Sequence, residues 1–447
     1  MAREKKEAAL TPEERLQAAL VPDWEWPYKL PGNWCWTTVG AINQYVGISA
    51  DPTKAKNKTF ELYSVPSSAD NYPEIVLGAD IGSTKQSVKK GDVLLCKINP
   101  RINRVWKVSK YTDHSLLASS KWIVIRNSGL ISNYLMWCFR SPYFRGYMLS
   151  NVSGVGGSLM RAQPKFVQGY PVPVPPLPEQ QRIVDRIESL FSKLDEAKEK
   201  AQAVVDSFET RKAAILHKAF TGELTAKWRE EHGVSIDNWK TTRFDSVAAI
   251  RSNLVDPAEY QSFPHIAPDN IEKKTGVLLE YHTIAEDGVT SGKHRFYSGQ
   301  ILYSKIRPYL SKAVVVDFDG LCSADMYPIE AYQNARCLWY YMLSDEFLLQ
   351  ASTAGSRSVL PKINQKELSA LTVHLPTNDR EQEEIARILD ELFDKEQQTK
   401  EAAEIVLDQI ELMKKSILAR AFRGELGTND PSEESAVELL KEIIRRG

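Results

Sequence analysis

The 447-residue sequence lacks the features of a membrane-spanning or disulfide-stabilised protein. No apolar run approaches the length needed to cross a bilayer. The first residues, Met1–Glu7, lack the apolar core of a signal peptide. The five cysteines are odd in number and form no CxxC pair, so a disulfide framework is not expected. We therefore expect the chain to work in a reducing cytoplasm.

Motifs of catalytic, cofactor or metal chemistry are also missing. Gly78–Lys85 superficially resembles a phosphate-binding loop, but its spacing and the order of its lysine and hydroxyl residues are wrong. In Pro268–Lys273 the acids are not separated enough to form one nuclease-like metal site, and Asn99–Arg101 is not the Asn-Pro-Pro-aromatic loop of adenine methylation. The seven histidines show no zinc spacing with cysteine. The sequence thus predicts no catalytic residue, no cofactor and no metal on this chain.

What the sequence does contain is one long repeat. Residues Glu179–Leu224 recur without a gap as Glu381–Leu426, at an offset of 202 residues. Each copy begins with Glu-Gln and ends with Ala-Phe-x-Gly-Glu-Leu. This period is too long for a solenoid. It indicates two similar halves, each ending in a long helix.

Apolar residues inside each copy follow the alternating steps of four and three that are typical of a coiled coil. The predicted seam residues are Ile183, Ile187, Leu190, Leu194, Val204, Phe208 and Ile215 in the first copy and Ile385, Leu389, Leu392, Val406, Ile410 and Ile417 in the second. Arg211 interrupts the first stripe, and Glu396 and Thr399 interrupt the second. We expect the two copies to pack against each other.

A globular segment precedes each long helix, and the two segments share landmarks. Asn33-Trp34 recurs as Asn238-Trp239, and Gly91–Pro100 matches Gly299–Pro308. Residues 24–178 carry 18 lysines and arginines against 8 acids, a net charge of +10, whereas residues 233–378 carry 14 against 16. One segment is therefore basic enough to bind a polyanion.

This order of segments resembles the specificity subunit of type I restriction–modification enzymes. The resemblance is carried by Leu-Pro-Glu-Gln-Gln-Arg-Ile before a long helix and Ala-Phe-x-Gly-Glu-Leu after it, in an arrangement that occurs twice, although the second helix starts with Asn378–Gln382 and lacks the proline-rich form. The resemblance implies an α+β fold with two pseudo-symmetric target-recognition domains separated by an antiparallel coiled coil. The implied divisions are 1–22 (a helical segment), 23–178 (the first recognition domain), 179–232 (the central helix), 233–378 (the second recognition domain), 379–426 (the C-terminal helix) and 427–447 (an acidic tail with a short helix).

The resemblance further implies a function and partners. Each domain would read one half of a bipartite, asymmetric site on double-stranded DNA, and the coiled coil would set the spacer. Such subunits have no catalytic centre and assemble in bacterial or archaeal cells with two methyltransferase subunits, which methylate adenine N6, and with restriction subunits. S-adenosylmethionine, ATP and Mg are expected on those partners. Four residues at the helix ends are candidates for docking the methyltransferase subunits, with helix capping as the alternative role: Phe220, Glu223, Phe422 and Glu425.

Candidate DNA contacts follow a predicted strand in each domain. Arginine can pair with guanine and asparagine with adenine, and basic groups bind phosphate. The candidates are Lys97, Asn99, Arg101, Asn103, Arg104 and Lys107 in the first domain and Lys305, Arg307, Tyr309 and Lys312 in the second. Two glycine-containing loops, whose backbone can approach phosphate, add Ser158, Arg161, Lys165, Arg357, Ser358 and Lys362. The alternative is that these are ordinary solvated loops.

Two other classes of function stay open at this point. A stand-alone DNA-modifying enzyme would methylate or cut DNA unaided, and a coiled-coil tether would bind DNA without regard to sequence. The missing cofactor loops count against the enzyme, and the basic first domain counts against the tether.

Overall fold

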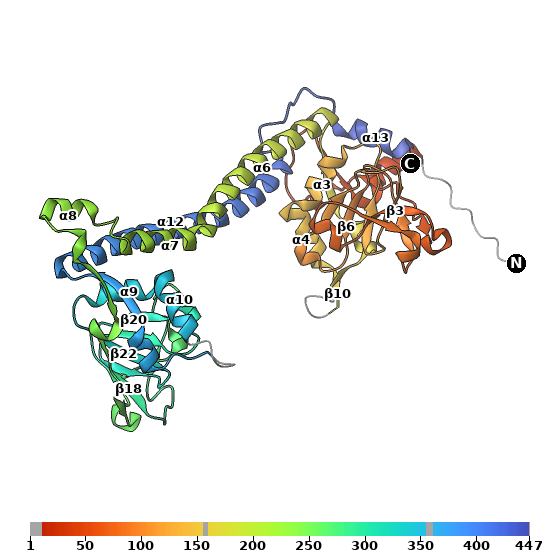
Figure 1. The fold of residues 1–447 in the computed structure, drawn as a ribbon. Coiled ribbons are helices and arrows are strands. Elements are labelled where there is room, and N and C mark those ends of the chain that lie inside the picture. Colours follow the sequence, from red (N-terminus) through yellow and green to blue (C-terminus); the bar gives the residue numbers. More distant parts are fainter. Residues whose placement is uncertain (1–10, 155–159, 355–360, 447) are drawn as a thin grey trace. The chain divides into compact units, whose positions relative to one another are not determined.

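The computed structural model describes residues 11–154, 160–354 and 361–446. They form two compact units (Figure 1). The first unit comprises the residues up to Lys200 together with those from Val406 onward, and the second comprises Ala201–Ile405. Each unit contains one globular domain of mixed helices and sheets and a stretch of two long helices, so the predicted α+β fold is confirmed.

The globular domain of the first unit, domain 1, is built on a three-stranded sheet (β7-β6-β9) and a five-stranded sheet (β2-β5-β8-β3-β4). Short pairs β1-β12 and β10-β11 complete it. Its strands are β1 (Cys35–Thr38), β2 (Ser49–Ala50), β3 (Thr59–Tyr63), β4 (Glu74–Leu77), β5 (Lys85–Ser87), β6 (Val93–Cys96), β7 (Val105–Lys107), β8 (Ser115–Ala118), β9 (Trp122–Ile125), β10 (Val152–Ser153), β11 (Arg161–Ala162) and β12 (Pro171–Val174). Its helices are α1 (Pro12–Ala19), α2 (Val39–Ile42), α3 (Ser132–Arg140), α4 (Pro142–Ser150), α5 (Pro164–Val167) and α13 (Ala436–Arg446).

The globular domain of the second unit, domain 2, repeats this plan with a four-stranded sheet (β14-β22-β19-β20), a five-stranded sheet (β15-β18-β21-β16-β17) and the pair β13-β23. Each five-stranded sheet includes one parallel pair, β3 with β8 and β16 with β21. The strands are β13 (Trp239–Arg243), β14 (Ala248–Ile250), β15 (Leu254–Val255), β16 (Pro264–Ile266), β17 (His282–Thr283), β18 (Lys293–Phe296), β19 (Ile301–Ser304), β20 (Ala313–Val315), β21 (Gly320–Cys322), β22 (Met326–Ala331) and β23 (Thr372–Pro376). The short helices are α8 (Ala226–His232), α9 (Ala335–Met342), α10 (Asp345–Ala354) and α11 (Gln365–Ala370).

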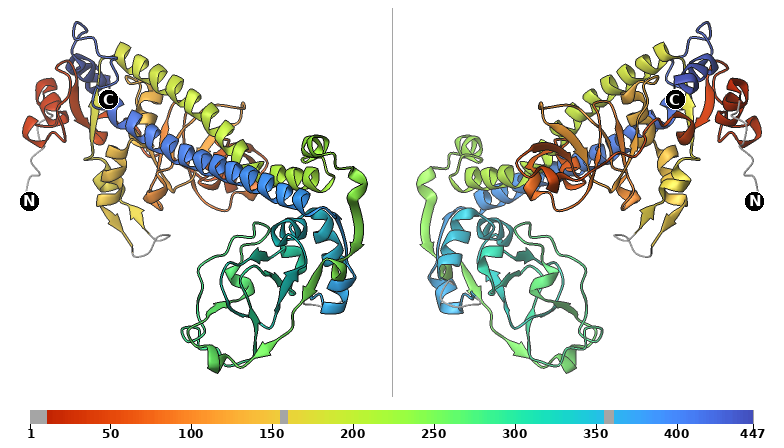
Figure 2. Two further views of the ribbon diagram at one scale, coloured as in Figure 1. Left: turned by 90° about the vertical axis from the view of Figure 1, so that its left-hand side faces the viewer. Right: turned by 90° about the vertical axis from the view of Figure 1, so that its right-hand side faces the viewer.

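The long helices are α6 (Leu177–Asp206), α7 (Phe208–Phe220) and α12 (Asp379–Ala421). They lie side by side and antiparallel within each unit (Figures 1 and 2). In the first unit the ammonium of Lys198 lies 2.8 Å from the Glu411 carboxylate, and the lower-numbered Asp195 pairs with the higher-numbered Lys414. The predicted antiparallel pairing is therefore confirmed.

The predicted first helix is not continuous, because it breaks at Ser207. Just after the break, the guanidinium of Arg211 donates to the carbonyl oxygen of Val204 (3.2 Å) and to the Ser207 hydroxyl. Its Nε lies 2.7 Å from the carboxylate of Glu396 on α12. The two polar interruptions of the predicted seam, Arg211 and Glu396, thus face each other as an ion pair.

The seam prediction is wrong for Val406, which is 40% exposed. The predicted seam residue Ile410 is 3% exposed and Ala403 is 8% exposed, so both belong to the buried stripe of α12. Between these two residues the half-buried apolar side chain is Leu407, one position after Val406, so the alternation of four and three is not kept at this point.

Seam residues near the start of each long helix have a second role. Ile183 and Ile187 are fully buried in the core of domain 1, and Ile385 and Leu389 are fully buried in the core of domain 2. They fasten the N-terminal part of each long helix to the domain that precedes it.

The acidic C-terminal tail is also part of domain 1. In α13 the side chains of Ala436, Leu440 and Ile443 are buried in the same core as Trp36. None of the helices in the described part of the chain has the length and apolar character of a membrane span.

Candidate nucleic-acid interface

A buried strand runs into a tight turn at the same place in both domains. The side chains of β6 and β19 are buried throughout, as expected for short apolar runs inside a sheet. Each strand is followed by a short 3₁₀ turn, η5 (Pro100–Ile102) in domain 1 and η10 (Pro308–Leu310) in domain 2. The two spans that the sequence matched, 91–100 and 299–308, therefore form equivalent strand-end turns.

Both turns are held in an unusual backbone conformation. The residues on either side of η5, Asn99 and Asn103, have φ of 46° and 51°, and those on either side of η10, Arg307 and Ser311, have φ of 48° and 47°. They are four of the six non-glycine residues with positive φ among the described residues. Left-handed backbone costs on the order of 1–3 kcal/mol where the side chain is neither glycine nor asparagine, and such strain gathers at binding sites.

In domain 1 a second predicted segment joins the turn. The backbone N–H of Asn99 donates to the carbonyl of Met160 (2.9 Å), and that of Ala162 donates to the carbonyl of Lys97 (2.8 Å). Arg161 stands opposite Ile98 in an isolated bridge. The structure thus brings together the first basic span and the segment that follows the glycine loop.

Domain 2 makes the same junction with its own residues. The N–H of Arg307 donates to the carbonyl of Pro361 (2.8 Å), and that of Ile363 donates to the carbonyl of Lys305 (2.9 Å). Lys362 stands opposite Ile306. Each domain therefore presents one composite surface. It consists of the strand-end turn and the segment that follows the predicted glycine-containing loop of that domain.

The outward-facing residues of these surfaces differ between the domains. In domain 1 Arg101 is exposed beside Ile102, which is 53% exposed, whereas Tyr309 holds the position of Arg101 in domain 2 and is 47% exposed. Arg307 and Lys165 are exposed, and Arg104 is half-buried.

Several predicted DNA contacts bind within their own domain. The Lys305 ammonium donates to the carbonyl of Ala324 (2.5 Å), and the Lys362 ammonium lies 3.2 Å from the Asp325 carboxylate. Three others lie beside the turns. The Asn103 amide donates to the carbonyl of Arg140 (3.2 Å), and the Lys107 ammonium donates to the Asn133 side chain (2.5 Å). Lys312 donates to the carbonyl of Pro268 (2.6 Å), and its side chain is only 14% exposed. These three residues support the turns. Ser158, Arg357 and Ser358 lie outside the described residues.

The predicted docking residues separate into two kinds. The phenyl rings of Phe220 and Phe422 are 5% and 1% exposed, and they pack 5.0 Å from the ring of Tyr341 and 5.4 Å from that of Tyr134. The prediction that these rings dock a partner is wrong, because they fill the domain cores. Glu223 and Glu425 are exposed and stay candidates.

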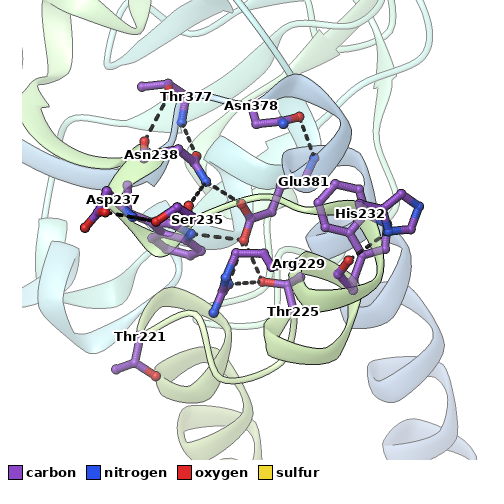
Figure 3. Close-up of polar contacts among 12 residues, drawn as sticks. Thr221, Thr225, Arg229, His232, Ser235, Asp237, Asn238, Thr377, Asn378 and Glu381 are labelled. Carbon is purple, nitrogen blue, oxygen red and sulfur yellow. Dashed lines mark hydrogen bonds and ion pairs between the residues drawn. The ribbon is translucent and has the colours of Figure 1, made fainter.

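The repeated Glu-Gln pair anchors the start of each long helix to its globular domain. The buried carboxylate of Glu381 accepts hydrogen bonds from Thr225 (2.8 Å), Trp239 (3.0 Å) and Asn238 (3.0 Å) (Figure 3). It also pairs with the guanidinium of Arg229 at 2.7 Å. One side chain thus ties the start of α12 to the segment after α7 and to the first strand of domain 2.

Glu179 occupies the matching place in the first unit with a different set of donors. Its carboxylate accepts from the Trp34 indole (2.8 Å) and the Asn429 amide (2.8 Å). The cation one turn along, Arg182, pairs with Glu433 at 2.7 Å. Glu179 is therefore fully buried, and it has no ion pair of its own among the residues that the structure describes.

The glutamine of each pair fixes the neighbouring helix of the domain. Gln180 accepts from the backbone N–H of Ile131 (3.0 Å) and donates to the carbonyl of Pro175 (3.0 Å). Gln382 accepts from the N–H of Asn334, the residue before α9 (3.3 Å). The repeated motif is therefore a structural junction that is built twice.

The two glutamates have opposite pKa shifts. Burial raises the pKa of Glu179 above its ordinary value, and the hydrogen bonds from Asn429 and Trp34 offset this only in part. Burial also acts to raise the pKa of Glu381, but the hydrogen bonds from Asn238 and Arg229 outweigh it and leave that pKa below its ordinary value.

We expect the two junctions to respond to acid in opposite directions. Glu381 stabilises the folded state above its unfolded pKa of about 4.3, and this contribution is lost as the pH falls through its lower folded pKa. Glu179 gains stability from protonation as the pH falls through its raised folded pKa. In urea unfolding of the full chain, the stability difference between wild type and Glu381→Gln should shrink from neutral to acidic pH, and that between wild type and Glu179→Gln should move the other way. If both stability differences shrank, or both grew, as the pH fell, the opposite pKa shifts of Glu179 and Glu381 would be contradicted.

Sequence reasoning missed the donors around these glutamates and two further residues beside the turns, Lys121 and Asp325. The recurring Asn-Trp pair at the start of each domain was the available signal for the donors. Lys121 and Asp325 each precede a buried strand, β9 and β22, that pairs with the strand leading into the turn.

Comparison with known proteins gives consistent matches. The profile of the family described as type I restriction modification DNA specificity domain matches residues 48–205 and 236–406. The type I restriction enzyme EcoDI specificity subunit of Escherichia coli is 35% identical over 370 residues, which cover 76% of this chain and 82% of that protein. The EcoKI specificity subunit of Escherichia coli K12 is 24% identical and covers 72% of this chain and 73% of that protein.

Two solved structures share the fold. One is a chain from a study of complex assembly and conformational transition in a type I R-M system, with a TM-score of 0.71. The other is the HsdS subunit from Thermoanaerobacter tengcongensis, with a TM-score of 0.62. Each is 20% identical to this chain and covers 90% of it and 100% of the solved chain.

Proposed function

Because this chain belongs to the family of type I restriction–modification DNA specificity subunits, we propose that it reads a bipartite, asymmetric DNA site with one domain on each half. The observation that carries the proposal is the matched pair of strand-end turns with left-handed backbone in domains 1 and 2. A binding surface that occurs once in each half of the chain suits a site that is read in two parts.

The turns supply what base recognition requires. A rigid backbone lowers the entropy lost on binding. The exposed Arg101 of domain 1 can form paired hydrogen bonds with guanine in the major groove. Tyr309 at the same position of domain 2 has one hydroxyl and an aromatic face, so we expect the two domains to prefer different bases.

We further propose that the chemistry resides on other polypeptides. Two methyltransferase subunits would bind S-adenosylmethionine and methylate adenine N6, and restriction subunits would use ATP and Mg. The support is the identity of the relatives, which are named as specificity subunits. Glu223 and Glu425 are exposed at equivalent ends of α7 and α12, which suits two identical partners.

Exchange of the first domain tests whether each domain recognises one half of the DNA site. We expect replacement of residues 24–178 by the corresponding segment of a relative to change only one half of the recognised sequence. The donor segment should retain a tryptophan at position 34, because the Trp34 indole holds Glu179. Mapping of N6-methyladenine in cells that express the chain with its partners measures both halves at once. A change in both halves would refute the proposal, and the unexchanged chain is the control.

A further inference from the structure

Three cations surround the end of β6 in domain 1. The backbone N–H of Lys97 donates to the carbonyl of Lys121 (3.1 Å), so these two residues stand opposite each other on neighbouring strands. Arg161 stands opposite the next residue, Ile98. Lys121 and Arg161 are exposed, and Lys97 is half-buried.

Within the described part of the chain, no acidic side chain forms an ion pair with these three cations. Among the described residues, none of the three side chains makes an ion pair or a hydrogen bond. Burial lowers the pKa of the Lys97 ammonium, and the charges of Lys121 and Arg161 lower it further. Like charges opposite each other in a sheet oppose folding, so the stability of the domain does not account for the cluster.

Domain 2 has the same three positions with one charge reversed. Lys305 corresponds to Lys97, because its N–H donates across the sheet to the carbonyl of Asp325 (3.0 Å), and Lys362 stands opposite the next residue, Ile306. Asp325 therefore takes the place of Lys121. Its carboxylate lies 3.2 Å from the Lys362 ammonium and 3.8 Å from that of Lys305, which also donates to the carbonyl of the preceding Ala324 (2.5 Å).

We propose that Lys97, Lys121 and Arg161 form a binding site for a backbone phosphate of DNA, and that Asp325 withholds the matching lysines of domain 2 from the DNA backbone. This rests on the proposed function and deepens it. The first domain supplies most of the salt-dependent affinity, because lysine and arginine bind phosphate and release counterions. The second domain contributes sequence reading with little backbone attraction.

The surroundings of the cluster favour a nucleic acid backbone. The strained turn that presents Arg101 begins two residues after Lys97, so a phosphate bound at the cluster would place the neighbouring bases close to the turn. The imbalance also matches the whole domains, since residues 24–178 have a net charge of +10 and residues 233–378 carry 14 basic against 16 acidic residues.

Reversal of the single differing charge in each domain tests the proposal. The full-length chain is titrated with a labelled duplex DNA of mixed sequence at several potassium chloride concentrations. Lys121→Asp should weaken binding about 10- to 100-fold at low salt and flatten the slope of log K against log salt by roughly 1 to 2. Asp325→Lys should tighten binding and steepen the slope by a similar amount.

Matched substitutions control for net charge and folding. Lys54→Asp and Asp317→Lys make the same charge changes at exposed positions of the same domains and should have much smaller effects. Lys121→Arg should bind as wild type does. Slopes for Lys121→Asp and Asp325→Lys that equal those of the controls would overturn the proposal, as would failure of the unsubstituted chain to bind at low salt. Loss of partner assembly by Lys121→Asp with an unchanged slope would assign the cluster to a protein partner and also overturn it.

A selection experiment separates this inference from the proposed function. Wild type and Lys121→Asp are each used to select bound duplexes from a random pool. Phosphate contacts carry no sequence information, so both proteins should return the same two-part motif. If wild type returns no motif, the proposed function fails. The slopes of log K against log salt then still test whether the three cations bind phosphate. If the motif appears and the slopes do not move, only the cluster assignment fails.

Discussion

Replacement of Arg229 by methionine is expected to destabilise the second unit by about 3–5 kcal/mol. The Arg229 guanidinium is 11% exposed and pairs with the fully buried carboxylate of Glu381 at 2.7 Å. Removal of the cation leaves a carboxylate that is buried without a counter-charge. Thr225, Asn238 and Trp239 still donate hydrogen bonds to it, but none of them carries a positive charge. The free energy of unfolding can be measured by urea titration of the full chain, followed by tryptophan fluorescence.

A matched control comes from the first unit. Arg182→Met removes a guanidinium that is 40% exposed and pairs with Glu433, whose side chain is 17% exposed, so its cost should stay below about 1 kcal/mol. Addition of Glu381→Gln to Arg229→Met should recover part of the loss, because the stranded charge is then absent. If Arg229→Met and Arg182→Met lowered the free energy of unfolding equally, burial of the ion pair would not be the cause of the loss.

The sequence could reveal the junction but not its chemistry. Glu-Gln appears twice because each unit contains the same structural junction between a long helix and its domain. A repeat of this kind is visible in a single sequence. The donors to Glu381 lie more than 140 residues earlier in the chain. No local spacing connects them, so their contacts appear only once the chain has folded.

The heptad pattern predicted the antiparallel pairing but not its details. Apolar spacing cannot distinguish a residue that faces the other long helix from one that faces a domain, and Ile183 and Ile385 lie in domain cores. Arg211 and Glu396 each resembled a defect in one stripe. They form a pair only in the register that the folded helices adopt. Val406 is exposed, although the spacing places it in the stripe.

The candidate interface was predictable where the two halves resemble each other. Matching spans, 91–100 and 299–308, located both strand-end turns. The sequence could not assign Lys121 or Asp325 to them, because these residues follow the turns by 19 and 15 positions along the chain and become their neighbours only through strand pairing. The burial of Phe220 and Phe422 likewise depends on packing that a repeated motif does not show.

Addition of four residues to each long helix is expected to move the preferred DNA site to a wider spacer. Four helical residues add about 6 Å, which corresponds to one or two base pairs of duplex. Suitable insertion points are after Lys200 in α6 and after Ile405 in α12, which leave the Arg211–Glu396 pair and both junctions intact. Affinity for the original site should fall toward the non-specific level, a loss of roughly 1,000-fold or more. Selection from a random duplex pool measures the new spacer directly.

Insertion into one helix alone provides the control for this result. It shifts α6 against α12 and separates pairs such as Lys198 and Glu411, so it should reduce stability and yield no new spacer. The paired insertion restores the register of the two helices while it lengthens both. A wider spacer from the paired insertion alone would show that helix length sets the distance between the half-sites. An unchanged spacer in a folded, DNA-binding double insertion would mean that the distance is set elsewhere, in the domains or in the partner subunits.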